Sequence, residues 1–214
     1  MLAVSRRVVE ADAFTRAGRY KGWKPNLFPG MDLHKKTLGI VGGGRIGMLV
    51  AQRLHHGFGM KVLYHDIVRN SELEKTCHAK KASLNYVLKH ADAISVHVPL
   101  FPSTRHMLST QEFKLMKKTA ILVNTARGPV VDELALTKAL TKGEIAGAGL
   151  DVFECEPLID CNPNDTLELR KLPNVVMTPH IGSATHEARN AMSLVSAKNI
   201  LRFIEGKRLP NKVA

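Results

Sequence analysis

Three glycines between two apolar runs constrain this chain more than any other feature. Their spacing is G-x-G-x-x-G, at Gly42, Gly44 and Gly47, and the apolar run 38–41 ends just before them. A helical pattern follows the glycines, and a second apolar run leads to Asp66. Glycines in this order permit a tight turn and the close packing of a helix on a strand. The stretch therefore predicts a strand–turn–helix–strand unit.

This unit is typical of a site for a dinucleotide. A pyrophosphate would lie at the start of the helix that follows Gly44, where backbone N–H groups are unpaired and the helix dipole is positive. Asp66 comes 19 residues after Gly47, and an acid at about that distance accepts hydrogen bonds from the adenosine ribose. An ordinary structural turn is the alternative, and the order of the surrounding elements favours the dinucleotide.

Strands and helices alternate from residue 36 to about residue 180. This alternation predicts an α/β fold with a doubly wound parallel sheet, that is, a Rossmann-type dinucleotide-binding domain. Helices expected at 1–19 and 187–204 lie outside the alternation. The apolar runs that we expect to form strands are 38–41, 62–64, 93–98, 120–123, 145–150 and 175–178.

Composition and charge limit the class of partner. The formal charge is +12, but the basic residues are scattered, and only three Tyr and one Trp are available to stack on bases. Anionic small molecules explain the positive charge as well as nucleic acid does, and we expect no nucleic-acid partner. Nucleic-acid binding stays open as an alternative that would show salt-dependent affinity.

The chain also lacks signs of a membrane or secretory protein. No apolar run approaches the roughly 20 residues that span a bilayer, and the first residues carry too many charges for a secretory signal. The three cysteines, Cys77, Cys155 and Cys161, are odd in number and lack paired metal spacing. We therefore expect a cytoplasmic protein with no membrane partner, no disulfide framework and no metal site.

Three reactive residues follow predicted strands. Arg127, Glu156 and His180 come after the runs 120–123, 145–150 and 175–178. Ligands of such sheets bind beyond the carboxyl ends of the strands, so we expect the three side chains to converge on one crevice. Singly, each has a plainer interpretation as a surface ion pair, an exposed turn residue or a loop residue. Their shared placement favours a functional set.

These residue types suit hydride transfer to a 2-oxo acid. An arginine presents a permanently charged fork that matches a carboxylate. A histidine can donate a proton to the carbonyl oxygen near neutral pH, and an adjacent carboxylate would orient it and raise its pKa. The nicotinamide of the dinucleotide would carry the hydride.

Five ordered motifs resemble the D-isomer-specific 2-hydroxyacid dehydrogenases. The motifs are GGGRIG with Asp66, HVPLFPSTRH, NTARGPVVDE, GLDVFECEP and PHIGSATHEAR. Within the family, the chain is most similar to bacterial reductases of glyoxylate and hydroxypyruvate that also reduce 2-ketogluconate. The resemblance implies NAD(P)-dependent reduction of a small 2-oxo acid to the D-2-hydroxy acid, by a homodimer that pairs through the cofactor domain.

The resemblance also implies roles for single residues. Arg127 would bind the substrate carboxylate, His180 would be the general acid/base and Glu156 its partner. The cofactor would contact Gly42, Gly44, Arg45, Ile46, Gly47, Asp66, Pro99, Thr104, Thr125, Ala126, Asp151 and Ser183.

The resemblance implies three segments and a missing part. Residues 1–35 would be an interdomain helix and linker at the edge of the substrate domain, 36–184 the dinucleotide-binding domain, and 185–214 a helix that returns to the substrate domain. Family members carry a further N-terminal segment that forms most of a second lobe. We therefore expect this chain to supply the cofactor-binding half, with one wall of the substrate cleft absent.

Two further alternatives stay open. Asp66 would accept a bond from a ribose 2′-hydroxyl and repel a 2′-phosphate, which favours NAD, while Arg69 nearby leaves NADP as the alternative. Some relatives of this fold are non-catalytic NAD-responsive proteins, so a sensing module or an inactive fragment is the alternative to an enzyme. Arg127, Glu156 and His180 favour the enzyme.

Overall fold

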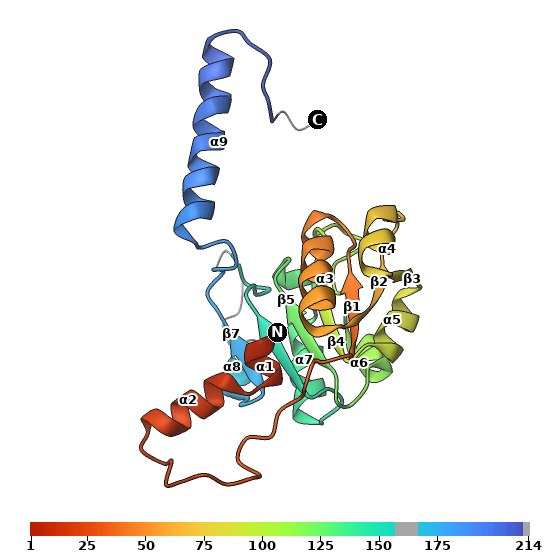
Figure 1. Cartoon of the computed structure of the whole chain (residues 1–214), viewed down its shortest axis with the longest axis vertical. Helices are drawn as coiled ribbons and strands as arrows, with labels where there is room; N and C mark the ends of the chain where they lie inside the picture. Colours follow the sequence, from red (N-terminus) through yellow and green to blue (C-terminus); the bar gives the residue numbers. More distant parts are fainter. Residues whose placement is uncertain (157–166, 212–214) are drawn as a thin grey trace. The chain divides into compact units, whose positions relative to one another are not determined.

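The computed structural model describes residues 1–156 and 167–211, and these form two compact units, 1–179 and 180–214 (Figure 1). The first unit is built on a parallel sheet with the strand order β3-β2-β1-β4-β5-β6-β7. The prediction of a doubly wound parallel sheet is confirmed. The strands are β1 Thr37–Val41, β2 Lys61–His65, β3 Lys80–Lys81, β4 Ala93–Val96, β5 Ile121–Asn124, β6 Gly147–Leu150 and β7 Val175–Met177.

Helices follow most of the strands, as a parallel sheet requires. The helices of the first unit are α1 Leu2–Ser5, α2 Val8–Arg16, α3 Arg45–Phe58, α4 Ser71–Cys77, α5 Leu84–His90, α6 Thr110–Leu115, α7 Glu133–Thr141 and α8 Leu167–Lys171, with a 3-10 turn at Gly128–Val130.

The expectation of a single helix over residues 1–19 is wrong, because two helices, α1 and α2, lie there. Arg7 has φ 53°, a left-handed conformation that ends α1 and starts α2. Periodicity of apolar residues cannot reveal such a break, because the apolar stripe continues on both sides of it. The polar stretch 67–82 also contains α4 and β3, which the apolar pattern did not predict.

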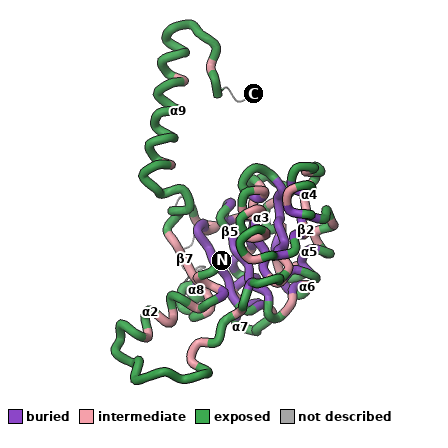
Figure 2. The backbone as a smooth tube through the Cα atoms, viewed as in Figure 1, coloured by how far each residue is buried: buried purple, intermediate pink, exposed green. Residues whose placement is uncertain are grey.

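Successive residues of the central strands pack into different hydrophobic clusters. Leu38 and Ile40 of β1 belong to one buried cluster, whereas Val41 belongs to the other. This is the alternation expected of a strand with both faces covered. Strands β1, β4, β5 and β6 are almost wholly buried, and the buried residues gather in the sheet (Figure 2). The sheet is therefore a rigid support for the loops at its edges.

Side chains cap helices α5 and α7 of the first unit. Ser83 accepts the N–H of Tyr86 at 3.3 Å and caps α5, and Asp132 accepts the N–H of Ala135 at 2.9 Å and caps α7. Such bonds satisfy backbone donors that have no partner within the helix.

The second unit contains α9, His186–Ile204, which is capped by Thr185. Apolar side chains along this helix are exposed, including Leu194, Leu201 and Ile204. No helix in the described part of the chain is long and apolar enough to cross a membrane.

Two cysteines lie in the described part of the chain: Cys77 is a buried free thiol and Cys155 is disulfide-bonded. One bonded cysteine is not the disulfide framework that the sequence argues against.

Candidate active site

The glycine turn after β1 lies where the strand order reverses, because β1 sits between β2 and β4. Gly42 has φ +100°, and a Cβ there would lie 2.6 Å from the backbone carbon of His97, just after β4. A Cβ on Gly47 would lie 2.1 Å from the carbonyl oxygen of Gly42. The turn is thus packed between the end of β4 and the first turn of α3, and only glycine fits at both positions.

Gly44 differs, because no atom of the chain lies within 4 Å of a Cβ built on it. It is the N-cap of α3, where no side chain caps the helix and the first turn holds no acidic residue. Arg45 is exposed there, and Ile46 is 66% exposed. The backbone N–H groups and the positive end of the dipole are thus available to an anion, which fits a dinucleotide pyrophosphate.

Asp66, directly after β2, is fixed beside this turn. Its Oδ2 accepts the N–H of Gly43 at 2.7 Å, and its Oδ1 accepts the N–H of Val68 at 3.0 Å. Asn70 holds the same glycine from the other side, since its Nδ2 donates to the carbonyl oxygen of Gly43 at 2.6 Å. Asp66 is half-buried, so a carboxylate edge lies next to the turn where the adenosine ribose of a dinucleotide is expected.

Arg69 is paired away from Asp66. Its Nη2 lies 2.7 Å from Oε2 of Glu74, and the Tyr64 hydroxyl donates to the other oxygen of Glu74 at 2.8 Å. The hydrogen bonds from Arg69 and then Tyr64 hold the pKa of Glu74 below its usual value. The positive charge near the expected ribose site is therefore partly neutralised.

The loop after β4 is closed by Thr104. The Thr104 hydroxyl donates to the carbonyl oxygen of Pro99 at 2.7 Å and accepts the N–H of Phe101 at 2.8 Å. Pro99 and Thr104, both expected to contact the cofactor, are thus joined by a hydrogen bond at the carboxyl edge of the sheet.

Asn124, the last residue of β5, shapes the loop that carries Arg127. Its side chain accepts the N–H of Ala126 at 3.0 Å and donates to the carbonyl oxygen of Arg127 at 2.9 Å. The Arg127 guanidinium donates to the carbonyl oxygen of Ala126 at 2.6 Å. Arg127 and Thr125 are exposed while Ala126 is buried, so the loop presents its polar side chains outward.

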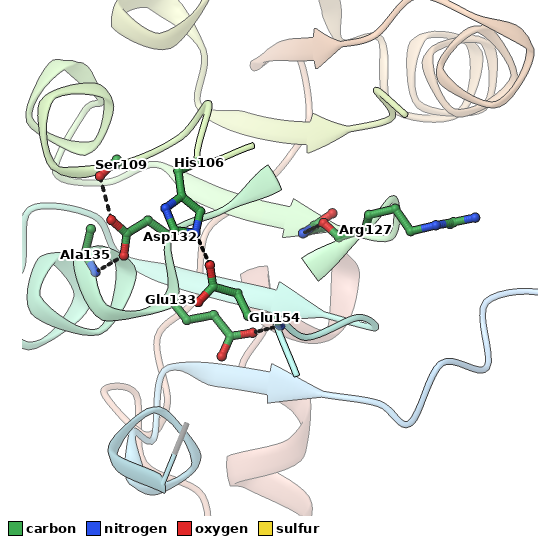
Figure 3. A network of polar contacts seen from close by, with 8 residues as sticks. His106, Ser109, Arg127, Asp132, Glu133, Ala135 and Glu154 are labelled. Atoms are coloured by element: carbon green, nitrogen blue, oxygen red, sulfur yellow. Dashed lines mark hydrogen bonds and ion pairs between the residues drawn. The ribbon is translucent and has the colours of Figure 1, made fainter. Parts of the chain in front are cut away.

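The Arg127 side chain points away from a polar cluster that contains His106, Ser109, Asp132 and Glu154 (Figure 3). In this cluster the Asp132 carboxylate accepts a hydrogen bond from the Ser109 hydroxyl at 2.8 Å. It also accepts the capping hydrogen bond from the N–H of Ala135. Burial alone would raise the pKa of Asp132, but these hydrogen bonds and the nearby His106 hold it below its usual value. His106 also contacts the Glu154 carboxylate. The cluster keeps the ionised carboxylate of Asp132 behind the loop that carries the guanidinium.

The remaining expected residues lie farther along the chain. Asp151, after β6, is buried and accepts a hydrogen bond from the Thr178 hydroxyl. Glu156 is exposed five residues later. His180 and Ser183 belong to the second unit, where His180 has φ 53°, a conformation that is uncommon for a non-glycine residue and that clusters at functional sites.

His97 was not singled out from the sequence, although it stands in one of the motifs. Burial lowers its pKa to about 4, because the charged ring is disfavoured there. Its Nε2 lies 2.9 Å from the buried Ser95 hydroxyl, and its backbone packs on Gly42. The ring is therefore neutral near pH 7 directly behind the glycine turn.

A comparison with family models decides the class of protein. Residues 1–182 match the model for D-isomer specific 2-hydroxyacid dehydrogenase, NAD binding domain. The chain belongs to this family. The resemblance seen in the motifs is confirmed, and the parallel sheet with its glycine turn is the NAD-binding domain of a 2-hydroxyacid dehydrogenase.

Individual relatives agree with the family. A glyoxylate reductase of Thermococcus litoralis is 53% identical across all of this chain and 63% of the relative. A solved glyoxylate reductase of Paecilomyes thermophila has TM-score 0.87 at 36% identity, covering 100% of this chain and 62% of that one. A D-lactate dehydrogenase of Lactobacillus jensenii, solved with NAD+, has TM-score 0.87 at 35% identity, with coverage of 100% and 65%. The chain thus spans somewhat under two thirds of the length of these relatives.

The half-buried His97 predicts a pH dependence of stability. Because its pKa is lower in the folded chain, the unfolded chain binds the proton first, and the free energy of unfolding falls as the pH drops from about 7 toward about 4. Urea unfolding at about pH 7 and about pH 5 should show a smaller loss for His97→Gln than for the parent chain. His56→Gln, on an exposed ring, should keep the parent's loss. An equal loss in parent and His97→Gln would contradict this account.

Proposed function

We propose that this protein reduces a small 2-oxo acid to the D-2-hydroxy acid with NADH, and that this chain supplies the cofactor-binding half. The observation that carries the proposal is the placement of the glycine turn with Asp66 and the Arg127 loop at the carboxyl ends of β1, β2 and β5 in one parallel sheet. A dinucleotide whose ribose bonds Asp66 and whose pyrophosphate lies at α3 extends along this edge. Its nicotinamide end would then approach Arg127.

The proposed roles follow from the chemistry of each side chain. Arg127 binds the carboxylate of the 2-oxo acid through its planar fork. His180 donates the proton that the carbonyl oxygen takes up, and Glu156 orients the imidazole ring for this transfer. Bound NADH supplies the hydride. Glyoxylate, hydroxypyruvate and 2-ketogluconate are the proposed substrates, and the names of the relatives support glyoxylate first.

Ligand contacts are also proposed for the residues around the turn. Gly42, Gly44 and Gly47 let the pyrophosphate approach, with N–H groups from Arg45 and Ile46. The other proposed cofactor contacts are Asp66, Pro99, Thr104, Thr125, Ala126, Asp151 and Ser183.

NAD is the cofactor that the site favours. A 2′-phosphate beside Asp66 would meet a carboxylate, while Arg69 is engaged by Glu74. NADP stays the alternative because of Arg69, which lines a hollow of about 630 Å³ beside Asp66 together with Lys80 and Lys81. We further propose a cytoplasmic homodimer that pairs through the cofactor domain.

The activity is tested by NADH oxidation with a panel of 2-oxo acids. The chain is fused to the part of the Thermococcus litoralis relative that it does not cover, which we expect to be the N-terminal lobe. Glyoxylate, hydroxypyruvate or 2-ketogluconate should be turned over. Arg127→Gln should raise the KM for the oxo acid about tenfold or more, because a charge-assisted pair is lost, while the KM for NADH changes little.

Arg105→Gln removes the same charge from another exposed arginine of the carboxyl edge and should leave both constants near the parent's. No turnover of any 2-oxo acid by the fusion, or an unchanged KM in Arg127→Gln, would refute the proposed function.

Cofactor selectivity is tested by releasing Arg69. Glu74→Gln removes the charge that holds the guanidinium and should lower the KM for NADPH several-fold relative to that for NADH. The double variant Arg69→Gln, Glu74→Gln should lose this gain, and Glu72→Gln on the exposed side of α4 should never show it. A gain that persists without Arg69 would show that this ion pair does not set the selectivity.

A further inference from the structure

We propose that Glu133 is a positioning residue that holds the loop bearing Glu156 against the loop bearing Arg127. Its side chain ties the two loops by accepting a hydrogen bond from the backbone of the other loop, and it does not itself touch the substrate. The inference rests on the proposed function, because it assigns Glu133 a part in the reaction that Arg127 and Glu156 serve.

The burial of Glu133 is the first observation. It is the first residue of α7, and only 2% of it is exposed. A carboxylate is costly to bury unless its bonding compensates, although its place at a helix start is favourable for a negative charge. A solvated surface role is therefore excluded, and one partner of the carboxylate indicates what it does.

That partner is the backbone of another loop. Oε1 of Glu133 accepts the N–H of Glu154 at 2.6 Å, across 21 residues of sequence. Bonds from an N–H group to an ionised carboxylate are stronger than bonds between neutral groups. Glu154 lies two residues before Glu156, and Glu133 lies six residues after Arg127. One hydrogen bond thus joins the segments that carry the two proposed active-site groups.

The two loops also touch through their backbones. A Cβ on Gly128 would lie 1.9 Å from the carbonyl carbon and oxygen of Phe153. The peptide after Arg127 therefore lies directly on the peptide before Glu154. Because the two backbones touch, the hydrogen bond from the Glu154 N–H to Glu133 fixes the position of one loop relative to the other.

A third loop braces the same joint (Figure 3). The imidazole of His106 contacts the Glu154 carboxylate, and the N–H of His106 donates to the carbonyl oxygen of Pro129 at 2.8 Å. Glu154, after β6, is thus bonded both to His106 in the loop after β4 and to Glu133 after β5. His106 in turn is bonded to the loop after β5 through Pro129. A displacement of about 1 Å in a catalytic group can cost roughly a hundredfold in rate, so such bracing has a kinetic consequence.

The test compares Glu133→Ala with Glu133→Gln in the fusion described above. The Ala variant loses the acceptor and should lower kcat/KM for the oxo acid at least about tenfold, with the Kd for NADH within about twofold of the parent's. The Gln variant keeps an oxygen that accepts the Glu154 N–H and should recover most of the loss. Glu144→Ala, a half-buried glutamate beyond the end of α7, is the matched control and should keep the parent's constants.

Amide hydrogen exchange supplies a readout that does not depend on turnover. The N–H of Glu154 should exchange faster in Glu133→Ala than in the parent, while amides of the buried strand β4 keep their protection. Parent-like kinetics in Glu133→Ala, or unchanged exchange at Glu154, would overturn the positioning role. A parent fusion that turns over no 2-oxo acid, with faster exchange at Glu154 in the Ala variant, would instead overturn the proposed function and leave Glu133 as a structural tie only.

Discussion

The close packing of the turn after β1 is the constraint on which the rest of the structure depends. Its backbone is pressed between the end of β4 and the first turn of α3, where a single added methyl group at Gly42 or Gly47 would overlap other backbone atoms. This packing exposes the start of α3 without a side-chain cap. The NAD-binding edge of the family therefore arises from the absence of side chains, in a sheet whose central strands are almost completely buried.

Around this turn, the protein uses polar side chains to hold backbone segments. Asp66 and Asn70 hold opposite sides of Gly43, and Asn124 fixes the loop that carries Arg127. Glu133 does the same for the loop after β6. The carboxyl edge of the sheet is thus a set of loops with fixed geometry, and the side chains proposed to meet the substrate extend from loops that other residues hold in place.

The sequence predicted those parts of this architecture that have a local pattern. Apolar runs revealed six of the strands, because each of these signals lies within a few residues of sequence. Asn70 and Glu133 could not be found this way, since their bonds to Gly43 and Glu154 join segments more than 20 residues apart with no sequence period. Asn70 did carry one readable sign, as the capping residue before the polar run of α4.

The central claim is that the glycine turn and Asp66 form the adenosine end of an NAD site, and titration of this chain with NAD+ followed by amide NMR tests it most directly. The account predicts saturable shifts at the amides of residues 42–47 and at Asp66, with weaker binding in Asp66→Ala. Shifts confined to the amino-terminal ends of the strands, or an unchanged Kd in Asp66→Ala, would contradict it.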